Sequence, residues 1–75
     1  MRTLDQLAPG GVARIVRVGG HGAIVQRLAE MGVLVDARVR MVRTAPLGDP
    51  LEIELDGCFL SLRKADARAI EVADG

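Results

Sequence analysis

Few side chains in this 75-residue sequence are of the types that perform acid–base, nucleophilic or metal chemistry. There is one histidine, His21, and one cysteine, Cys58, which together offer a Cys–His pair or a pair of soft metal ligands. Structural and catalytic zinc sites both need more protein ligands than these residues supply. We therefore interpret His21 as a polar turn residue and Cys58 as a small strand residue. The sequence predicts no catalytic residue, no metal site and no cofactor, so the protein is not expected to be an enzyme.

Two other patterns resemble binding sites. Glu52 and Glu54 share one face of a predicted strand, with Asp56 at its end, and paired carboxylates can bind Mg²⁺ or Ca²⁺. Strand alternation explains them without an ion, because residues two apart point to the same, solvated face. Gly19–Gly22 precedes a predicted helix, where anions can bind, but it lacks the spacing of known phosphate-binding loops. We interpret both patterns as structural.

Composition excludes several classes of function. Ten basic residues balance ten acidic ones, and Phe59 is the only aromatic residue, so a nucleic-acid partner is not expected. A single cysteine cannot form an internal disulfide, which fits a reducing compartment. No stretch approaches the roughly 20 apolar residues that span a bilayer. The sequence therefore predicts a cytoplasmic protein that does not insert into membranes.

The length suits one domain, residues 1–75, with an aliphatic core. Hydrophobic alternation and β-branched residues predict five short strands, and helical spacing predicts one principal helix that ends at Gly32. Alternation breaks at Ile15-Val16, which is typical of a β-bulge or of a strand buried on both faces, and Val42 is again out of phase. Asp56 and Gly57 are typical of a two-residue hairpin turn. The predicted strands cover residues 12–18, 37–44, 51–55, 58–63 and 69–72, the helix covers 22–31, short helical turns lie at 3–6 and 64–68, and residues 74–75 are expected to fray.

Short strands with one inserted helix predict a mostly β fold. The strands do not alternate with helices along the chain, which disfavours a parallel sheet with crossover helices. Curling the sheet limits the number of free strand edges. We therefore expect a small β-barrel of about five strands, with the helix inserted between two of them and helical turns near both ends of the chain.

Three separated blocks carry a resemblance to a known family. They are residues 26–33 (QRLAEMGV), residues 45–50 (APLGDP) and residues 60–63 (LSLR). In this order and spacing they resemble FeoA, the small cytosolic component of bacterial ferrous iron transport, and residues 4–10 and 67–72 extend the similarity over nearly the whole chain. The resemblance implies an SH3-like β-barrel without enzymatic activity. It also implies a partner, FeoB, a membrane ferrous-iron transporter with a cytosolic GTPase domain, which the protein would bind and modulate.

The resemblance also indicates where such a partner would bind. We expect the contact surface to comprise the principal helix and the loop after the second long strand, through Arg27, Met31, Leu47, Gly48, Asp49 and Pro50. Gly32 and Gly48 are expected to adopt backbone angles that favour glycine. Asp49 is expected to cap N–H groups of the loop, and Arg27 or Arg63 to hold the loop by hydrogen bonds. Where the family usually has Pro-Gly after the helix, this chain has Val35 and Asp36, and Asp also tolerates a left-handed turn position.

Two other functions are compatible with the sequence. The chain is similar in expected fold to the C-terminal SH3-like domain of metal-dependent transcriptional repressors. A dimer could instead bind a divalent metal through His21 or Cys58 of each copy. The sequence also allows a weak homo-oligomer.

Overall fold

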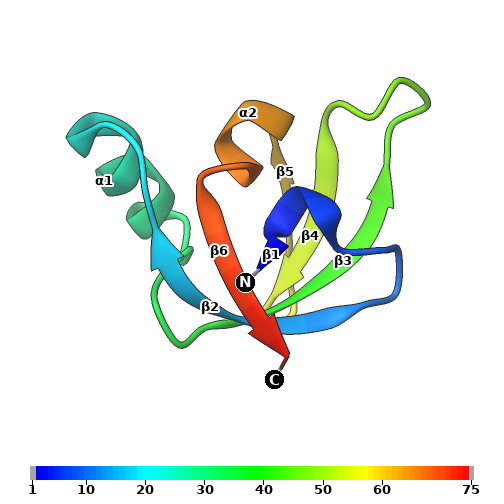
Figure 1. The fold of residues 1–75 in the computed structure, drawn as a ribbon, viewed down its shortest axis with the longest axis horizontal. Coiled ribbons are helices and arrows are strands. Elements are labelled where there is room, and N and C mark those ends of the chain that lie inside the picture. Colours follow the sequence, from blue (N-terminus) through cyan, green and yellow to red (C-terminus); the bar gives the residue numbers. More distant parts are fainter. Residues whose placement is uncertain (1, 75) are drawn as a thin grey trace.

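A computed structural model describes residues 2–74, which form short β-strands and short helices (Figure 1). The strands are antiparallel wherever they pair, and two short helical segments flank them near the chain ends. In chain order the elements are β1 (Arg2–Thr3), the 3-10 helix η1 (Leu4–Gln6), β2 (Val12–Val18), α1 (Gly22–Glu30), β3 (Arg38–Thr44), β4 (Leu51–Leu55), β5 (Cys58–Leu62), α2 (Lys64–Ala67) and β6 (Ile70–Asp74).

The strands form one curled sheet in the order β1-β6-β2-β3-β4-β5. Across residues 2–74, β1 and β5 are the two edges and do not pair with each other, so the expected small barrel of about five strands is a curled but open sheet of six strands. The additional strand is β1, whose two residues are too few to show alternation. Figure 1 shows the sheet curving around the interior, with α1 on one side and α2 above it.

Both breaks in alternation are β-bulges. The register between β2 and β6 shifts between Ile15 and Arg17, and the register between β3 and β4 shifts between Met41 and Arg43. Val16 and Val42 are therefore the extra residues, which explains why each breaks the alternation of its strand. Bulges increase local twist, and these two help to curl the sheet.

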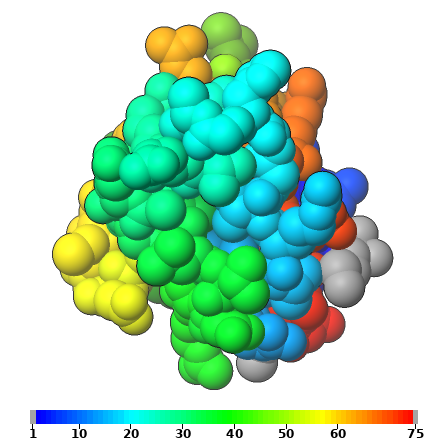
Figure 2. All heavy atoms as spheres, turned by 90° about the vertical axis from the view of Figure 1, so that its left-hand side faces the viewer, coloured from blue at the N-terminus to red at the C-terminus, as the bar shows by residue number. Residues whose placement is uncertain are grey.

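The core is aliphatic, as predicted, and α1 contributes to it. Leu28 of α1 is completely buried, together with Ile15, Met41 and Ile53 from the central strands. Figure 2 shows α1 lying over one side of the molecule, above the segment that leads into β3. The helix therefore covers an open side of the curled sheet.

Two turns have the conformations that their residues predict. Asp56 and Gly57 have φ angles of 50° and 83°, as a two-residue type I′ hairpin turn requires. Asp36 has φ 75°, and the N–H of Ala37 donates to Leu34 O at 3.1 Å, closing the turn before β3. Asp36 thus adopts the left-handed conformation at the position where the family usually has the glycine of Pro-Gly, as expected of an aspartate in a turn.

Helix α1 ends at the predicted glycine. Gly32 has φ 95°; its N–H donates to Ala29 O at 3.0 Å, and the N–H of Val33 donates to Leu28 O at 2.9 Å. These two bonds form a Schellman motif, and Leu28 and Val33 are both buried, as the accompanying apolar contact requires. The same bonds direct the chain away from α1 and back toward the sheet.

The C-terminal end is more ordered than predicted. Asp74 belongs to β6 and pairs with Ala13 of β2, so the expectation that it frays is wrong, while Gly75 lies outside the described residues. The order of Asp74 depends on the pairing of β6 with β2, which lies far away in the sequence.

Substitution of Gly32 tests the end of α1. Gly32→Ala should lower the free energy of unfolding by about 1–2 kcal/mol, because a Cβ is disfavoured at this positive φ although no atom lies within 4 Å of it. Gly22→Ala is the matched control: it too has open space around its Cβ but lies in the helix without a positive φ, and should be neutral or stabilising. Urea unfolding of both variants measures the difference, and equal effects would contradict this account of Gly32.

Candidate functional site

Two of the predicted contact residues, Arg27 and Asp49, bind the short helix α2. Asp66 of α2 accepts a hydrogen bond from Arg27 of α1 at 3.1 Å, and the N–H of Lys64 donates to Asp49 Oδ1 at 3.0 Å. In Figure 1, α1, α2 and the loop between β3 and β4 all lie at the same end of the molecule. Residues from separate parts of the sequence thus form one surface.

The loop of residues 45–50 is closed by its own backbone. The N–H of Ala45 donates to Pro50 O at 3.0 Å, and the N–H of Gly48 donates to Ala45 O at 2.7 Å. Gly48 has φ 85°, which confirms the prediction of a backbone angle that favours glycine. At the tip, Leu47 is 96% exposed. An apolar side chain is thus held in solvent on a turn whose conformation is already set.

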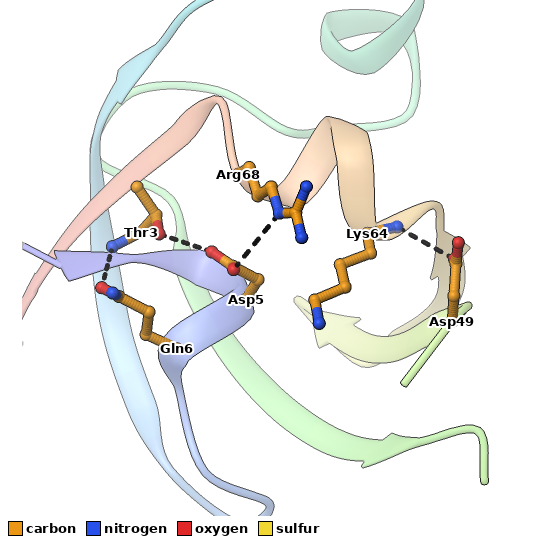
Figure 3. A network of polar contacts seen from close by, with 6 residues as sticks. All are labelled: Thr3, Asp5, Gln6, Asp49, Lys64 and Arg68. Carbon is orange, nitrogen blue, oxygen red and sulfur yellow. Dashed lines mark hydrogen bonds and ion pairs between the residues drawn. The ribbon is translucent and has the colours of Figure 1, made fainter. Parts of the chain in front are cut away.

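Asp49 and Arg27 have partners other than the predicted ones. Asp49 does not cap N–H groups of its own loop; its carboxylate accepts from the first residue of α2 (Figure 3). Arg27 does not hold the loop directly, because its guanidinium pairs with Asp66. Arg63 makes no ion pair within residues 2–74, so it does not hold the loop by one either. The loop is instead attached to α2 through Asp49, and α2 to α1 through Arg27.

The other end of α2 is tied to the N-terminal segment. Arg68 Nε lies 4.0 Å from Asp5 Oδ2, and the hydroxyl of Thr3 donates to the same carboxylate group (Figure 3). The Thr3 N–H donates to Gln6 Oε1 at 3.0 Å, which stabilises the first turn of η1. Helix α2 therefore receives polar contacts along its whole length.

A shallow groove of about 180 Å³ runs between α1 and β5. Met31, one of the residues predicted to contact a partner, lines this groove, whereas Pro50 lines a separate hollow. The β5 residues of the groove were not predicted, since nothing in their sequence identifies β5 as an edge strand. The groove is lined by Arg27, Leu28, Met31, Ser61, Leu62, Arg63 and Asp66.

The patterns interpreted as structural have structural partners. Glu52 pairs with Arg43 at 3.1 Å, and Glu54 pairs with Arg40, all on the outer face of the sheet. Residues 2–74 contain no group of three or more His, Cys, Asp or Glu side chains arranged to hold a metal ion. Among the same residues, no helix is both long and apolar enough to cross a bilayer.

Known proteins resemble this chain closely. A protein of Porphyromonas gingivalis in which Fe(2+) transport protein A is fused to the Fe(2+) transporter FeoB is 41% identical over 69 residues, covering 92% of this chain and 8% of the fusion protein. The solution structure of iron(II) transport protein A from Clostridium thermocellum superposes with a TM-score of 0.91 at 36% identity, covering 96% of this chain and 44% of that one. This chain thus spans less than half the length of either protein.

Two further structures bear on the fold. FeoA of Stenotrophomonas maltophilia, a prokaryotic SH3 domain protein solved with zinc, has a TM-score of 0.83 at 30% identity, covering 97% of this chain and 91% of that one. A manganese-dependent transcriptional repressor matches with a TM-score of 0.89 at 22% identity, covering 96% of this chain and 35% of the repressor. The first structure identifies the curled sheet as SH3-like. The second likeness concerns the fold alone.

A family model decides between the FeoA proteins and the transcriptional repressors as relatives of this chain. The model of the FeoA domain matches residues 2–74, which is nearly the whole sequence and includes all three blocks that carried the resemblance. FeoA domains are small SH3-like accessory domains of ferrous iron transport and are not a family of enzymes. The chain belongs to the FeoA domain family.

Proposed function

We propose that this protein is a cytoplasmic accessory protein of ferrous iron uptake that binds an FeoB-type transporter at its cytosolic GTPase part and modulates transport. The observation that carries the proposal is the Porphyromonas gingivalis relative, in which a domain 41% identical to this chain is covalently joined to FeoB. Joining two proteins raises their effective concentration for each other, which is useful where the two must associate. A separate FeoA chain must achieve the same association by affinity.

The surface around α2 is the proposed contact, through Arg27, Met31, Leu47, Gly48, Asp49 and Pro50. Two properties support it. The loop is closed by two backbone bonds and attached to α2, so little conformational freedom remains to be lost on binding. Leu47 offers almost its full apolar surface for burial.

Modulation follows if the surface binds one state of the transporter more tightly than another. A bound protein shifts a conformational equilibrium only by the difference between its affinities for the two states. We therefore propose that affinity for the GTPase part differs between its GTP-bound and GDP-bound forms. Titrating labelled protein against that part, with a GTP analogue or GDP, tests this; no binding to either form would contradict the proposal.

Truncation of Leu47 should weaken binding. Burying a leucine side chain contributes about 1.5–3 kcal/mol, so Leu47→Ala should reduce affinity about tenfold or more. The control is Val12→Ala, because Val12 is 41% exposed on the outer face of the sheet beside Arg40, away from the loop. Isothermal titration of both variants provides the measurement. Unchanged affinity of Leu47→Ala would exclude the loop tip as a contact.

A pair of substitutions at Asp49 tests how the loop is held. Asp49→Ala removes the acceptor for the Lys64 N–H, whereas Asp49→Asn keeps an oxygen there. Loss of a helix cap costs about 1 kcal/mol, so the alanine variant should bind about fivefold more weakly and the asparagine variant should remain close to the parent. Faster exchange of the Lys64 amide in Asp49→Ala alone would confirm the cause, and equal affinities of both variants would contradict it.

A further inference from the structure

Strand β5 has an edge with unpaired backbone groups. Leu55 and Cys58 flank the two-residue turn and form a hydrogen-bonded pair, so Cys58, Leu60 and Leu62 direct their N–H and C=O groups to β4. The alternate residues, Phe59 and Ser61, direct theirs away from β4. No other segment of residues 2–74 pairs with these groups, because β5 is the last strand of the sheet and no loop or helix backbone bonds to it.

This edge lacks the features that usually protect edge strands. β5 contains no charged residue and no proline, and its pairing with β4 has no bulge. By contrast, the other edge, β1, is two residues long and includes Arg2. Phe59, the only aromatic residue of the chain, is 59% exposed on β5. An unprotected apolar edge favours pairing with a further strand.

The groove between α1 and β5 lies beside the C-terminal end of this free edge. Consecutive strand residues point to opposite faces, so a groove lined by both Ser61 and Leu62, with Arg63 directly after the strand, lies at the side of β5 and not over one face. β4 occupies the other side. An exposed strand edge faced by a helix is the arrangement in which proteins bind an extended peptide as an added strand.

The groove and the residue beside it define the chemistry of the occupant. Met31 lines the groove, and Leu60 directly precedes the lining residues of β5. Both are only partly buried against the core, which leaves apolar surface for a side chain of an added strand. Arg63 makes no ion pair within the described residues, whereas Arg27 is already paired with Asp66. The occupant therefore carries an apolar side chain and a carboxylate.

We propose that the free edge of β5 binds an extended segment of the partner protein, which adds a strand beside Phe59 and Ser61, places an apolar side chain against Met31 and Leu60, and pairs a carboxylate with Arg63. This deepens the proposed function, on which it rests for the identity of the partner. A second copy pairing through its own β5 is a weaker candidate, because that strand (CFLSL) contains no carboxylate to pair with Arg63.

Amide hydrogen exchange tests the added strand directly. In the free protein the amides of Phe59 and Ser61 should exchange rapidly, while those of Leu60 and Leu62 are protected by β4. At about 90% saturation with a partner strand, the exchange of Phe59 and Ser61 should slow about tenfold, because exchange then proceeds from the free fraction. Two probes are used: the cytosolic part of an FeoB-type transporter, and the synthetic peptide acetyl-Thr-Val-Glu-Val-Thr-amide at millimolar concentration.

The outcomes separate this inference from the proposed function. Binding of the transporter part with slowed exchange at Phe59 and Ser61 supports both. Binding without slowed exchange overturns the strand and leaves the function standing. If the transporter part does not bind but the peptide slows both amides, the function fails and the strand site stands. If neither probe slows them, or if they slow with rising protein concentration alone, the partner strand is wrong.

A backbone variant provides an independent readout. Ser61→Pro removes an N–H that faces away from β4, so the sheet retains its own bonds while the added strand loses one. Ser61→Thr keeps the N–H and is the matched control. Affinity for the probe that binds should fall about fivefold or more in Ser61→Pro alone, the loss of about one net hydrogen bond. Circular dichroism establishes that both variants are folded, and equal affinities would argue against strand addition.

Discussion

The short helix α2 connects the parts of this molecule that lie far apart in the sequence. Its residue Ala67 is completely buried, which anchors it on the core. Its polar groups then contact three other segments: Asp49 in the loop, Arg27 in α1 and Asp5 in η1. Each of these contacts contributes little to stability, because it lies at an exposed or half-exposed site. Together they fix the positions of the loop, α1 and the N-terminal turn relative to one another. The candidate surface depends on this placement.

Local structure could be predicted from the sequence wherever a single residue type determines the backbone. The Asp56-Gly57 turn and the end of α1 at Gly32 are confirmed, and the break in alternation at Val42 is a bulge, because positive φ angles and broken alternation are visible within a few residues. The expected barrel is confirmed only in part, since the sheet is curled but open. Closure depends on whether the edge strands β1 and β5 meet, and neither local pattern nor composition contains that information.

In the candidate site, too, local motifs could be recognised in the sequence, whereas contacts between distant segments could not. The family motifs predicted a contact surface at Arg27, Met31 and the loop, and the structure brings Arg27 and Asp49 to the same helix. Their hydrogen-bond partners could not be predicted, because Asp66 and Lys64 are ordinary charged residues in a four-residue helix. The contribution of β5 was missed because a strand becomes an edge only through the order of the whole sheet.

The pairing of β1 with β6 determines where the two ends of the chain emerge. Arg2 lies opposite Val72, so the beginning and the end of the described chain are neighbours, and Figure 1 shows both below α1, α2 and the loop. A covalent extension at either end would leave on that side. This geometry permits a domain of this fold to be inherited as part of a longer polypeptide, with α1, α2 and the loop directed away from the point of attachment.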